Sequence, residues 1–163
     1  MGAALSRLCL WVPNPISIGV IGLRSAGKTT LVHKLSGNPD PVKPSVETVE
    51  ITQVYPSGSN QQFNVFDYAG NPHWRPCWRS FMSRLQAVVF VIDSTDREAL
   101  QEAKWELVGL LKEDMLEQQP FLVLANKQDD PKAMSVAELT EYLDIQQYLD
   151  KPSKCASITT YTH

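Results

Sequence analysis

The segment from Gly22 to Thr29 carries residue types that can hold phosphate groups. It reads Gly22-Leu23-Arg24-Ser25-Ala26-Gly27-Lys28-Thr29 and fits the spacing G-x-x-x-x-G-K-[ST]. Glycines let the backbone wrap closely around an anion, so that its N–H groups point inward. Lys28 would bring a positive charge to the β- and γ-phosphates, and the Thr29 hydroxyl can ligate Mg²⁺. The segment lies between an apolar run and a helical pattern, which favours a phosphate-binding loop over a chance glycine-rich turn.

The string Asn126-Lys127-Gln128-Asp129 follows a strongly apolar run and adds a base-recognition chemistry. The carboxylate of Asp129 can accept hydrogen bonds from the N1–H and the 2-amino group of guanine. Adenine lacks both donors, so a buried carboxylate would stay unpaired there at a cost of about 1–3 kcal/mol. Alone, four residues are a weak signal, and a polar loop after a strand is the alternative. After a phosphate-binding loop, the string indicates a guanine nucleotide.

A third motif, Asp67-Tyr68-Ala69-Gly70, lies between the other two in the sequence. Asp67 can hold Mg²⁺ through a water molecule, and the Gly70 N–H can contact a γ-phosphate. The pattern D-x-x-G is common by chance, and its weight comes from its place between the other motifs. Together the three motifs predict a site for GTP or GDP with Mg²⁺.

Four short apolar runs predict the strands that would position these motifs. They are Ile16–Ile21, Phe63–Phe66, Ala87–Ile92 and Phe121–Ala125. The last two are nearly continuous in Val, Ile, Leu and Phe, as expected of parallel strands buried on both faces. Residues 46–54 alternate less cleanly, and a turn over residues 55–60 pairs them with residues 62–67 as a hairpin.

Helical patterns fall between the predicted strands. A helix is predicted over Lys28–Leu35, and capping boxes at Thr95-x-x-Glu98 and Ser135-x-x-Glu138 predict the starts of two more. Strands that alternate with helices indicate an α/β fold. We expect a mostly parallel sheet with right-handed crossovers and helices on both faces.

The composition is that of an ordinary globular domain. The chain has 163 residues, of which 43% are hydrophobic and 20% charged. No repeat or boundary divides it, so we assign residues 16–163 to one domain. The net charge of −3 gives no electrostatic case for nucleic-acid binding. Cys9, Cys77 and Cys155 lack the spacing of a disulfide framework or a zinc site, which favours a reducing, cytoplasmic compartment.

Residues 1–15 form a separate, amphipathic segment. Met1-Gly2-Ala3-Ala4-Leu5-Ser6 fits the N-myristoylation pattern, with Gly2 as the acceptor. Apolar residues then recur at helical spacing, so residues 2–12 can lie on a membrane surface. One myristoyl chain binds membranes only marginally, and either the helix or palmitate on Cys9 would supply a second signal. The alternative is a short apolar arm packed on the domain.

With these motifs in this order, the chain resembles the P-loop small GTPases, and among them the Arf and Arf-like (ADP-ribosylation-factor-like) family. The segments that carry the resemblance are Gly22-Leu23, Ala26-Gly27-Lys28-Thr29-Thr30, Val46-Glu47-Thr48-Val49, Arg75-Pro76-Cys77-Trp78-Arg79, Val91-Ile92-Asp93-Ser94-Thr95-Asp96-Arg97 and Leu124-Ala125-Asn126-Lys127-Gln128-Asp129. The resemblance implies a P-loop NTPase fold and a GDP/GTP switch that recruits effectors at membranes. It further implies an exchange factor and an activating protein that act on the switch regions.

The resemblance also implies which residues form the site. Those expected to hold the nucleotide are Gly22, Ser25, Ala26, Gly27, Lys28, Thr29, Thr30, Gly70, Asn126, Lys127, Asp129, Cys155 and Ala156. Cys155-Ala156-Ser157 looks like the family's last guanine-contacting loop, in which the Ala156 backbone would approach the base. Thr29 would hold Mg²⁺ directly, and Asp67 would hold it through water.

Asn71 departs from the family pattern, which has a glutamine after the glycine of D-x-x-G to orient the attacking water. Asparagine has the same amide on a shorter side chain, and a misplacement of about 1 Å can cost about a hundredfold in rate. Alternatively, Asn71 caps a helix with Pro72 at its first position, and the pattern favours this role. Gly70 and Asn71 are therefore the catalytic candidates, and we expect hydrolysis to be slow.

Two further departures concern the first switch loop and the C-terminus. The family threonine that ligates Mg²⁺ and senses the γ-phosphate aligns with Pro41, which has neither a hydroxyl nor an N–H. Ser45 is the nearest hydroxyl. The family carries one more helix after the segment that Ser157 ends, whereas this sequence runs to His163. We expect that helix to be missing and apolar sheet surface to be exposed, which would mark a partner site or an unstable fold; a truncated isoform is an equally good explanation.

Two functions therefore stay open. One is an Arf-like GTPase that hydrolyses GTP slowly, and the other is a pseudo-GTPase that binds nucleotide without cycling and serves as an assembly subunit. The phosphate and base motifs support binding in both, whereas Pro41, Asn71 and the missing helix favour the second. A metabolic kinase is a third function, against which the string from Asn126 to Asp129 argues. Nucleotide turnover distinguishes the first two.

Overall fold

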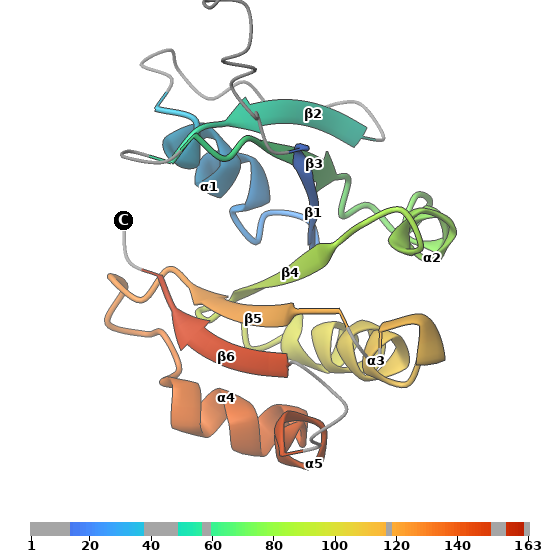
Figure 1. The fold of residues 1–163 in the computed structure, drawn as a ribbon. Coiled ribbons are helices and arrows are strands. Elements are labelled where there is room, and N and C mark those ends of the chain that lie inside the picture. Colours follow the sequence, from blue (N-terminus) through green and yellow to red (C-terminus); the bar gives the residue numbers. More distant parts are fainter. Residues whose placement is uncertain (1–13, 38–48, 57–59, 117–118, 151–155, 162–163) are drawn as a thin grey trace, which may run out of the picture.

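A computed structural model describes residues 14–37, 49–56, 60–116, 119–150 and 156–161. They form one six-stranded sheet in the order β2-β3-β1-β4-β5-β6 (Figure 1). The strands are β1 Ile16–Ile21, β2 Val49–Val54, β3 Phe63–Tyr68, β4 Ala87–Asp93, β5 Phe121–Asn126 and β6 Ala156–Thr160. The predicted strands are confirmed, and β6 adds an edge strand that the apolar runs did not indicate.

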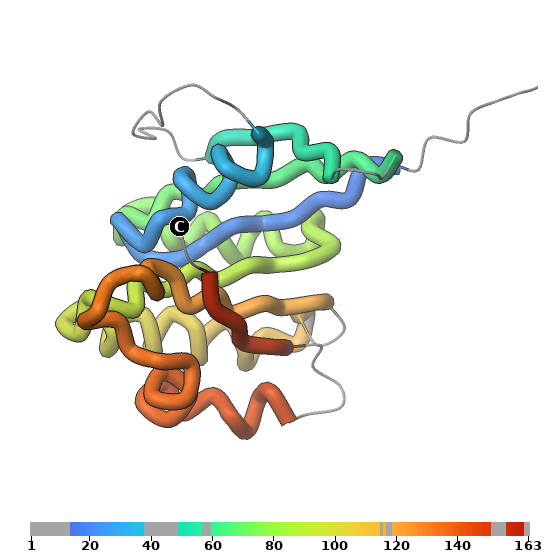
Figure 2. The backbone as a smooth tube through the Cα atoms, turned by 90° about the vertical axis from the view of Figure 1, so that its left-hand side faces the viewer, coloured from blue at the N-terminus to red at the C-terminus, as the bar shows by residue number. Residues whose placement is uncertain are grey.

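The sheet is parallel except at one edge. β1 pairs in parallel with β3 and β4, and β4, β5 and β6 continue in the same direction. β2 pairs antiparallel with β3, which confirms the predicted hairpin between them. Figure 2 shows β6 beside β5, at the opposite edge of the sheet from β2. All five parallel strands therefore end at the same edge of the sheet.

Helices cover both faces of the sheet, as predicted. They are α1 Lys28–Leu35, α2 Pro76–Met82, α3 Leu100–Leu111, the 3₁₀ turn η1 Asp114–Leu116, α4 Val136–Leu143 and α5 Gln146–Leu149. In Figure 1, α1 lies on one side of the sheet, and α2 and α3 lie on the other. Within the ranges given above, no helix is long and apolar enough to cross a bilayer.

Side chains that alternate along the strands pack into two apolar cores, one on each face of the sheet. Val20, Val65, Val91 and Leu124 pack with Leu31 and Val32 of α1. The neighbouring strand residues turn to the larger core on the other face. That core includes Ile21, Phe90, Val123, Trp78, Leu107, Leu139 and Leu143. Successive side chains of a strand point to opposite faces of the sheet, so each buried parallel strand packs against a core on both faces. This packing holds the strand ends rigidly in place.

Only one of the two predicted capping boxes forms. The Ser135 hydroxyl accepts the Glu138 N–H, and the Glu138 carboxylate accepts the Ser135 N–H, at the start of α4. The box predicted at Thr95 is wrong, because the N–H and hydroxyl of Thr95 both donate to Asp93 Oδ1, at 3.0 and 2.6 Å. The α3 helix starts five residues later, at Leu100. Asp93 at the end of β4 accepts the hydrogen bond of the Thr95 hydroxyl, so this side chain does not cap a helix.

Candidate functional site

The predicted motifs meet because they follow neighbouring parallel strands. The phosphate-binding loop, residues 22–27, leaves the end of β1. Asp67 lies near the end of β3, and Asn126 ends β5. Asp93 of β4 pairs with Asn126 in register, so the base-recognition string begins beside the end of β4. The carboxyl edge of the sheet is where open α/β folds bind their ligands.

The backbone of the phosphate-binding loop needs its glycines. Gly22 and Gly27 have φ angles of 140° and 95°, which favour glycine. A Cβ on Gly22 would lie 2.2 Å from the carbonyl oxygen of Val91, so no larger residue fits there. Ser25 also has a left-handed φ of 62° and is exposed, as a residue at the mouth of a site would be.

The loop ends at the N-terminus of α1, which favours anions. The first intrahelical bond runs from the Leu31 N–H to the Gly27 carbonyl oxygen, at 2.9 Å. The N–H groups of Lys28, Thr29 and Thr30 therefore have no partner within the helix. No acidic residue lies in the first turn to compete for them. These groups and the helix dipole can together bind a phosphate.

Lys28 is buried and faces back into the loop. Its Nζ donates to the Leu23 carbonyl oxygen at 2.7 Å. Burial lowers the pKa of Lys28 to about 8, although the Asp67 carboxylate raises it and Arg75 lowers it further. A buried ammonium that lacks full compensation gains from an anionic ligand. Lys28 can therefore supply the positive charge predicted for the phosphates.

Thr29 and Asp67 meet at the position predicted for a metal. The Thr29 hydroxyl donates to Asp67 Oδ2 at 2.5 Å, across two elements 38 residues apart. Burial raises the pKa of the Asp67 carboxyl, and the hydrogen bond from Thr29 and the charge of Lys28 oppose that rise. Oxygen ligands of this kind suit Mg²⁺, which takes few protein ligands and completes its shell with water and phosphate. The residues present thus fit a magnesium nucleotide.

Gly70 is pressed against the phosphate-binding loop. A Cβ on Gly70 would lie 2.4 Å from the Leu23 carbonyl carbon and 2.5 Å from the Gly22 carbonyl oxygen. Only glycine allows these two backbones to approach so closely. The third motif therefore adjoins the first, as the prediction of a shared γ-phosphate site requires.

Asn126 joins the base-recognition string to the phosphate-binding loop. It is fully buried, and its Nδ2 donates to the Ala26 carbonyl oxygen at 2.8 Å. A Cβ on Gly27 would lie 2.2 Å from the same Nδ2 atom. The other amide atom, Oδ1, has no hydrogen-bond partner among the described residues. A buried acceptor left open beside an anion-binding loop fits a ligand that brings a donor.

Lys127 has a left-handed backbone conformation, and its side chain forms an ion pair. Its φ angle is 61°, and its Nζ lies 2.5 Å from Asp93 Oδ2. Burial alone would raise the pKa of Asp93, but the hydrogen bonds from Lys127 and Thr95 outweigh it and lower the pKa. Asp129 follows in a turn and is exposed, so its carboxylate is accessible to a base.

The register of β6 corrects the prediction for Ala156. Ala156 pairs with Phe121, the first residue of β5, at the opposite end of that strand from Asn126. Five residues of strand, at about 3.3 Å each, separate it from the site. The end of β6 lies at the site edge instead, where the Tyr161 N–H donates to the Ala125 carbonyl oxygen at 3.1 Å. The β-branched run at residues 158–160 was the signal that the strand continues past Ala156.

Asn71 caps a turn rather than a helix. Its Oδ1 accepts the His73 N–H at 3.0 Å, and its carbonyl oxygen accepts the Trp74 N–H at 2.9 Å. The helix α2 begins at Pro76, so the predicted helix start at Pro72 is wrong. Since Oδ1 is already bonded, the side chain is held in a local turn. The predicted residues Gly2, Cys9, Pro41, Ser45 and Cys155 lie outside the described residues.

Comparison with known proteins agrees with this geometry. The model of the ADP-ribosylation factor family matches residues 3–162. A solved structure of the Arl6 BBS3 small GTPase from Trypanosoma brucei, with the bound nucleotide analogue GppNp, matches with a TM-score of 0.78. The two chains are 26% identical, and the match covers 91% of this chain and 87% of that one. Fold and site together define a small GTPase of the P-loop class. The chain belongs to the ADP-ribosylation factor family, which confirms the Arf-like resemblance.

Proposed function

We propose that this chain is a GDP/GTP switch that binds guanine nucleotide with Mg²⁺ and hydrolyses GTP slowly. The observation that carries the proposal is the meeting of Lys28, Asp67, Gly70 and Asn126 at one edge of the sheet. They come from the three motifs, with Asp67 and Gly70 at the two ends of D-x-x-G, and each motif has a separate role toward a nucleotide. The GppNp bound to the related Arl6 protein supports the same ligand class.

Phosphate and metal binding fall to the phosphate-binding loop and the D-x-x-G motif. Lys28 and the N–H groups at the start of α1, that of Thr30 among them, would neutralise the phosphates. Gly22, Ser25, Ala26 and Gly27 would shape the loop. Thr29 would ligate Mg²⁺ directly, which requires its hydroxyl to release Asp67. Asp67 would then hold the same ion through water. The metal would supply charge neutralisation to the β- and γ-phosphate oxygens.

Guanine binding falls to the string that follows β5. The Asp129 carboxylate would accept the two guanine donors, and Asn126 would present its open Oδ1 atom. The ion pair with Asp93 would hold the Lys127 stem across the base. The structure gives no support for Ala156 at the base, since its register places it at the far end of β5.

Slow hydrolysis follows from Asn71. Its side chain is one methylene shorter than a glutamine, and its Oδ1 is bonded to the His73 N–H. Hydrolysis of GTP depends on a side chain that orients the attacking water. An activating protein would have to remodel this turn or supply an arginine. Effectors and an exchange factor would bind the switch regions.

Membrane binding would depend on residues 2–12. A myristoyl group on Gly2, with the amphipathic segment or palmitate on Cys9, would hold the protein peripherally on the cytoplasmic face of a membrane. A role in membrane trafficking or effector recruitment follows from that location.

A non-cycling pseudo-GTPase is the second candidate. The bond from the His73 N–H to Asn71 Oδ1 favours it, because it holds the candidate catalytic amide in a local turn. In that case the bound nucleotide would stabilise the fold of an assembly subunit, and it would not switch the protein between a GTP-bound and a GDP-bound state.

Nucleotide content and turnover decide between the two candidates. The protein would be purified from cells and denatured, and the released nucleotide identified. GTP hydrolysis with Mg²⁺ would then be followed in single turnover. Bound GDP with measurable hydrolysis supports the switch, whereas retained GTP without turnover supports the pseudo-GTPase. A protein that carries no nucleotide and binds neither GDP nor GTP contradicts both.

A further inference from the structure

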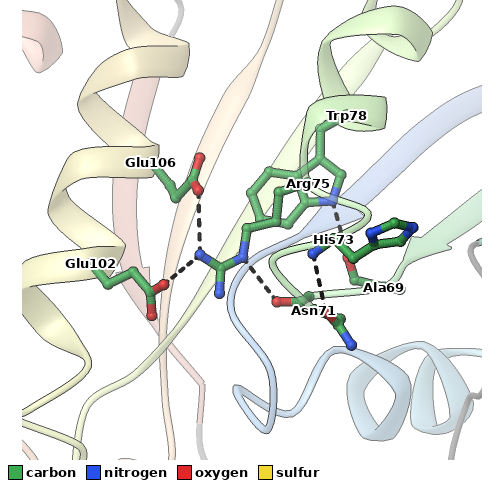
Figure 3. Close-up of polar contacts among 8 residues, drawn as sticks. Ala69, Asn71, His73, Arg75, Trp78, Glu102 and Glu106 are labelled. Carbon is green, nitrogen blue, oxygen red and sulfur yellow. Dashed lines mark hydrogen bonds and ion pairs between the residues drawn. The ribbon is translucent and has the colours of Figure 1, made fainter.

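Two buried side chains hold consecutive peptide groups of the loop that ends at Gly70 (Figure 3). The Trp78 Nε1–H donates to the Ala69 carbonyl oxygen at 3.2 Å. The Arg75 Nε–H donates to the Gly70 carbonyl oxygen at 3.0 Å. Both side chains come from the start of α2, so this helix fixes the orientation of the loop.

Fixing these two oxygens also fixes two N–H groups. A peptide group is planar and trans, so its N–H points away from its carbonyl oxygen. Trp78 therefore sets the direction of the Gly70 N–H, and Arg75 sets that of the Asn71 N–H. Gly70 lies against the phosphate-binding loop, where a Cβ would come within 2.6 Å of the Arg24 nitrogen. The two donors therefore have fixed directions on a loop that adjoins the phosphate-binding loop.

Arg75 is itself held by two carboxylates of α3. Its Nη1 lies 2.7 Å from Glu102 Oε1 and 3.3 Å from Glu106 Oε1. Glu102 and Glu106 are one helical turn apart, so they share one face of α3. The side chains of Arg75 and Glu106 are only 7% and 8% exposed, whereas that of Glu102 is 52% exposed. The rigid, multiply donating guanidinium bonds the loop and both carboxylates at once, which a lysine cannot do.

Another ion pair, between α2 and Glu113 just after α3, provides a contrast. Arg79 Nε lies 2.9 Å from Glu113 Oε1, and both side chains are about a third exposed or more, at 40% and 34%. This pair joins the middle of α2 to the segment that follows α3, and within the described residues the Arg79 side chain makes no hydrogen bond to the Gly70 loop. Among the described residues, three ion pairs therefore join the α2 region to α3 and the segment after it, and of the two arginines only Arg75 also bonds the D-x-x-G motif.

We propose that Arg75 is a positioning residue for the γ-phosphate, held in place by Glu102 and Glu106. The proposal rests on the proposed function, because it takes GTP as the ligand at Gly70. Arg75 keeps the loop in the orientation that receives a γ-phosphate, and GDP has no group for that loop to receive. By linkage, a change in α3 at Glu102 alters the preference for GTP over GDP. The α3 helix is thereby coupled to the nucleotide state.

The affinities of the full-length chain for GDP and for a non-hydrolysable GTP analogue test this coupling. Arg75→Lys keeps the positive charge and removes the fork that reaches Gly70 and α3 together. We expect its affinity for the GTP analogue to fall about tenfold, the effect of losing one hydrogen bond to a charged group, with little change for GDP. Arg79→Gln is the control, since it breaks the ion pair between α2 and Glu113, which follows α3. We expect it to leave the ratio of the two affinities unchanged.

Glu102→Gln is a second variant that tests the same contact if Arg75→Lys fails to fold. Glu102 is half exposed, so this variant should fold even where Arg75→Lys does not. It should lower the same ratio by a smaller factor, and a double-mutant cycle with Arg75→Lys should be non-additive. A ³¹P spectrum of the bound analogue adds a direct readout. Both variants should shift the γ-phosphate resonance and leave the α-phosphate resonance in place.

The outcomes separate this proposal from the proposed function. Equal loss of both nucleotides in Arg75→Lys and Glu102→Gln, or an unchanged ratio in both, overturns the positioning role while nucleotide binding stands. An Arg79→Gln variant that lowers the ratio as much as Glu102→Gln also overturns it. Wild-type protein that binds neither nucleotide overturns the proposed function and this proposal together.

Discussion

The side-chain amide of Asn126 donates to the carbonyl oxygen of Ala26 at 2.8 Å and joins two loops that lie 100 residues apart. One loop is predicted to hold phosphates and the other a purine base. A single buried hydrogen bond thus sets the spacing between the two halves of the candidate site. Because this bond joins two protein groups and does not itself contact a phosphate, its loss should lower the affinity for GDP and for GTP by the same factor.

Asn126→Ala tests this bond. It leaves the Ala26 carbonyl unsatisfied, so we expect the free energy of unfolding to fall by about 1–3 kcal/mol. Affinity for GDP and for a GTP analogue should fall by the same factor. Gln128→Ala is the control, since Gln128 Nε2 bonds the Met134 carbonyl oxygen, away from the phosphate-binding loop. Unequal effects of Asn126→Ala on the two nucleotides would contradict the spacing role.

The lowered pKa of Lys28, about 8, predicts a pH dependence of nucleotide binding. Below that pH the free protein carries a charged ammonium, which the phosphates require. Above it, binding must first take up a proton, so affinity falls about tenfold for each pH unit. GDP affinity should therefore drop about tenfold between pH 7 and pH 9. Lys28→Arg stays charged at both pH values, so any affinity it keeps should vary less, and a flat wild-type profile would count against the role of Lys28.

Asn71→Gln should increase the rate of GTP hydrolysis. The longer side chain extends the amide by one methylene toward the site, and we expect the single-turnover rate to rise about tenfold or more. Loss of the bond to the His73 N–H should lower the free energy of unfolding by about 1 kcal/mol or less. Asn71→Ala also loses that bond and has no amide, so it should show no gain in rate. Equal rates in the two variants would favour the pseudo-GTPase.

Ser135→Ala separates stability from function. It removes the capping box at the start of α4, which packs on β6 and α3. We expect a loss of about 1 kcal/mol in the free energy of unfolding, measured by denaturant titration. Nucleotide affinity should stay at the wild-type value, and Ser135→Asp should keep most of the stability. A fall in affinity with Ser135→Ala would show that α4 influences the site.

Features that depend on neighbours in the chain could be predicted from the sequence. The glycine and lysine spacing of the phosphate-binding loop, the helix Lys28–Leu35 and the capping box at Ser135 all appear as predicted. The end of β5 at Asn126 also follows from the length of its apolar run. Such features are decided by backbone preference, local capping and hydrophobic periodicity, which a single segment carries by itself.

Features that depend on distant partners were decided by the tertiary structure. Thr95 bonds Asp93 instead of capping α3, because the end of β4 brings that carboxylate within reach. Ala156 lies at the end of β6 that is far from the site. The register of β6 is set by its pairing with β5, and a short motif does not determine that register. No pattern in the sequence pairs Arg75 with α3, yet it bonds Glu102 and Glu106, 27 and 31 residues away, as well as the nearby Gly70. The chain order of the motifs identifies the class of site, and only packing between elements decides which side chains hold it in place.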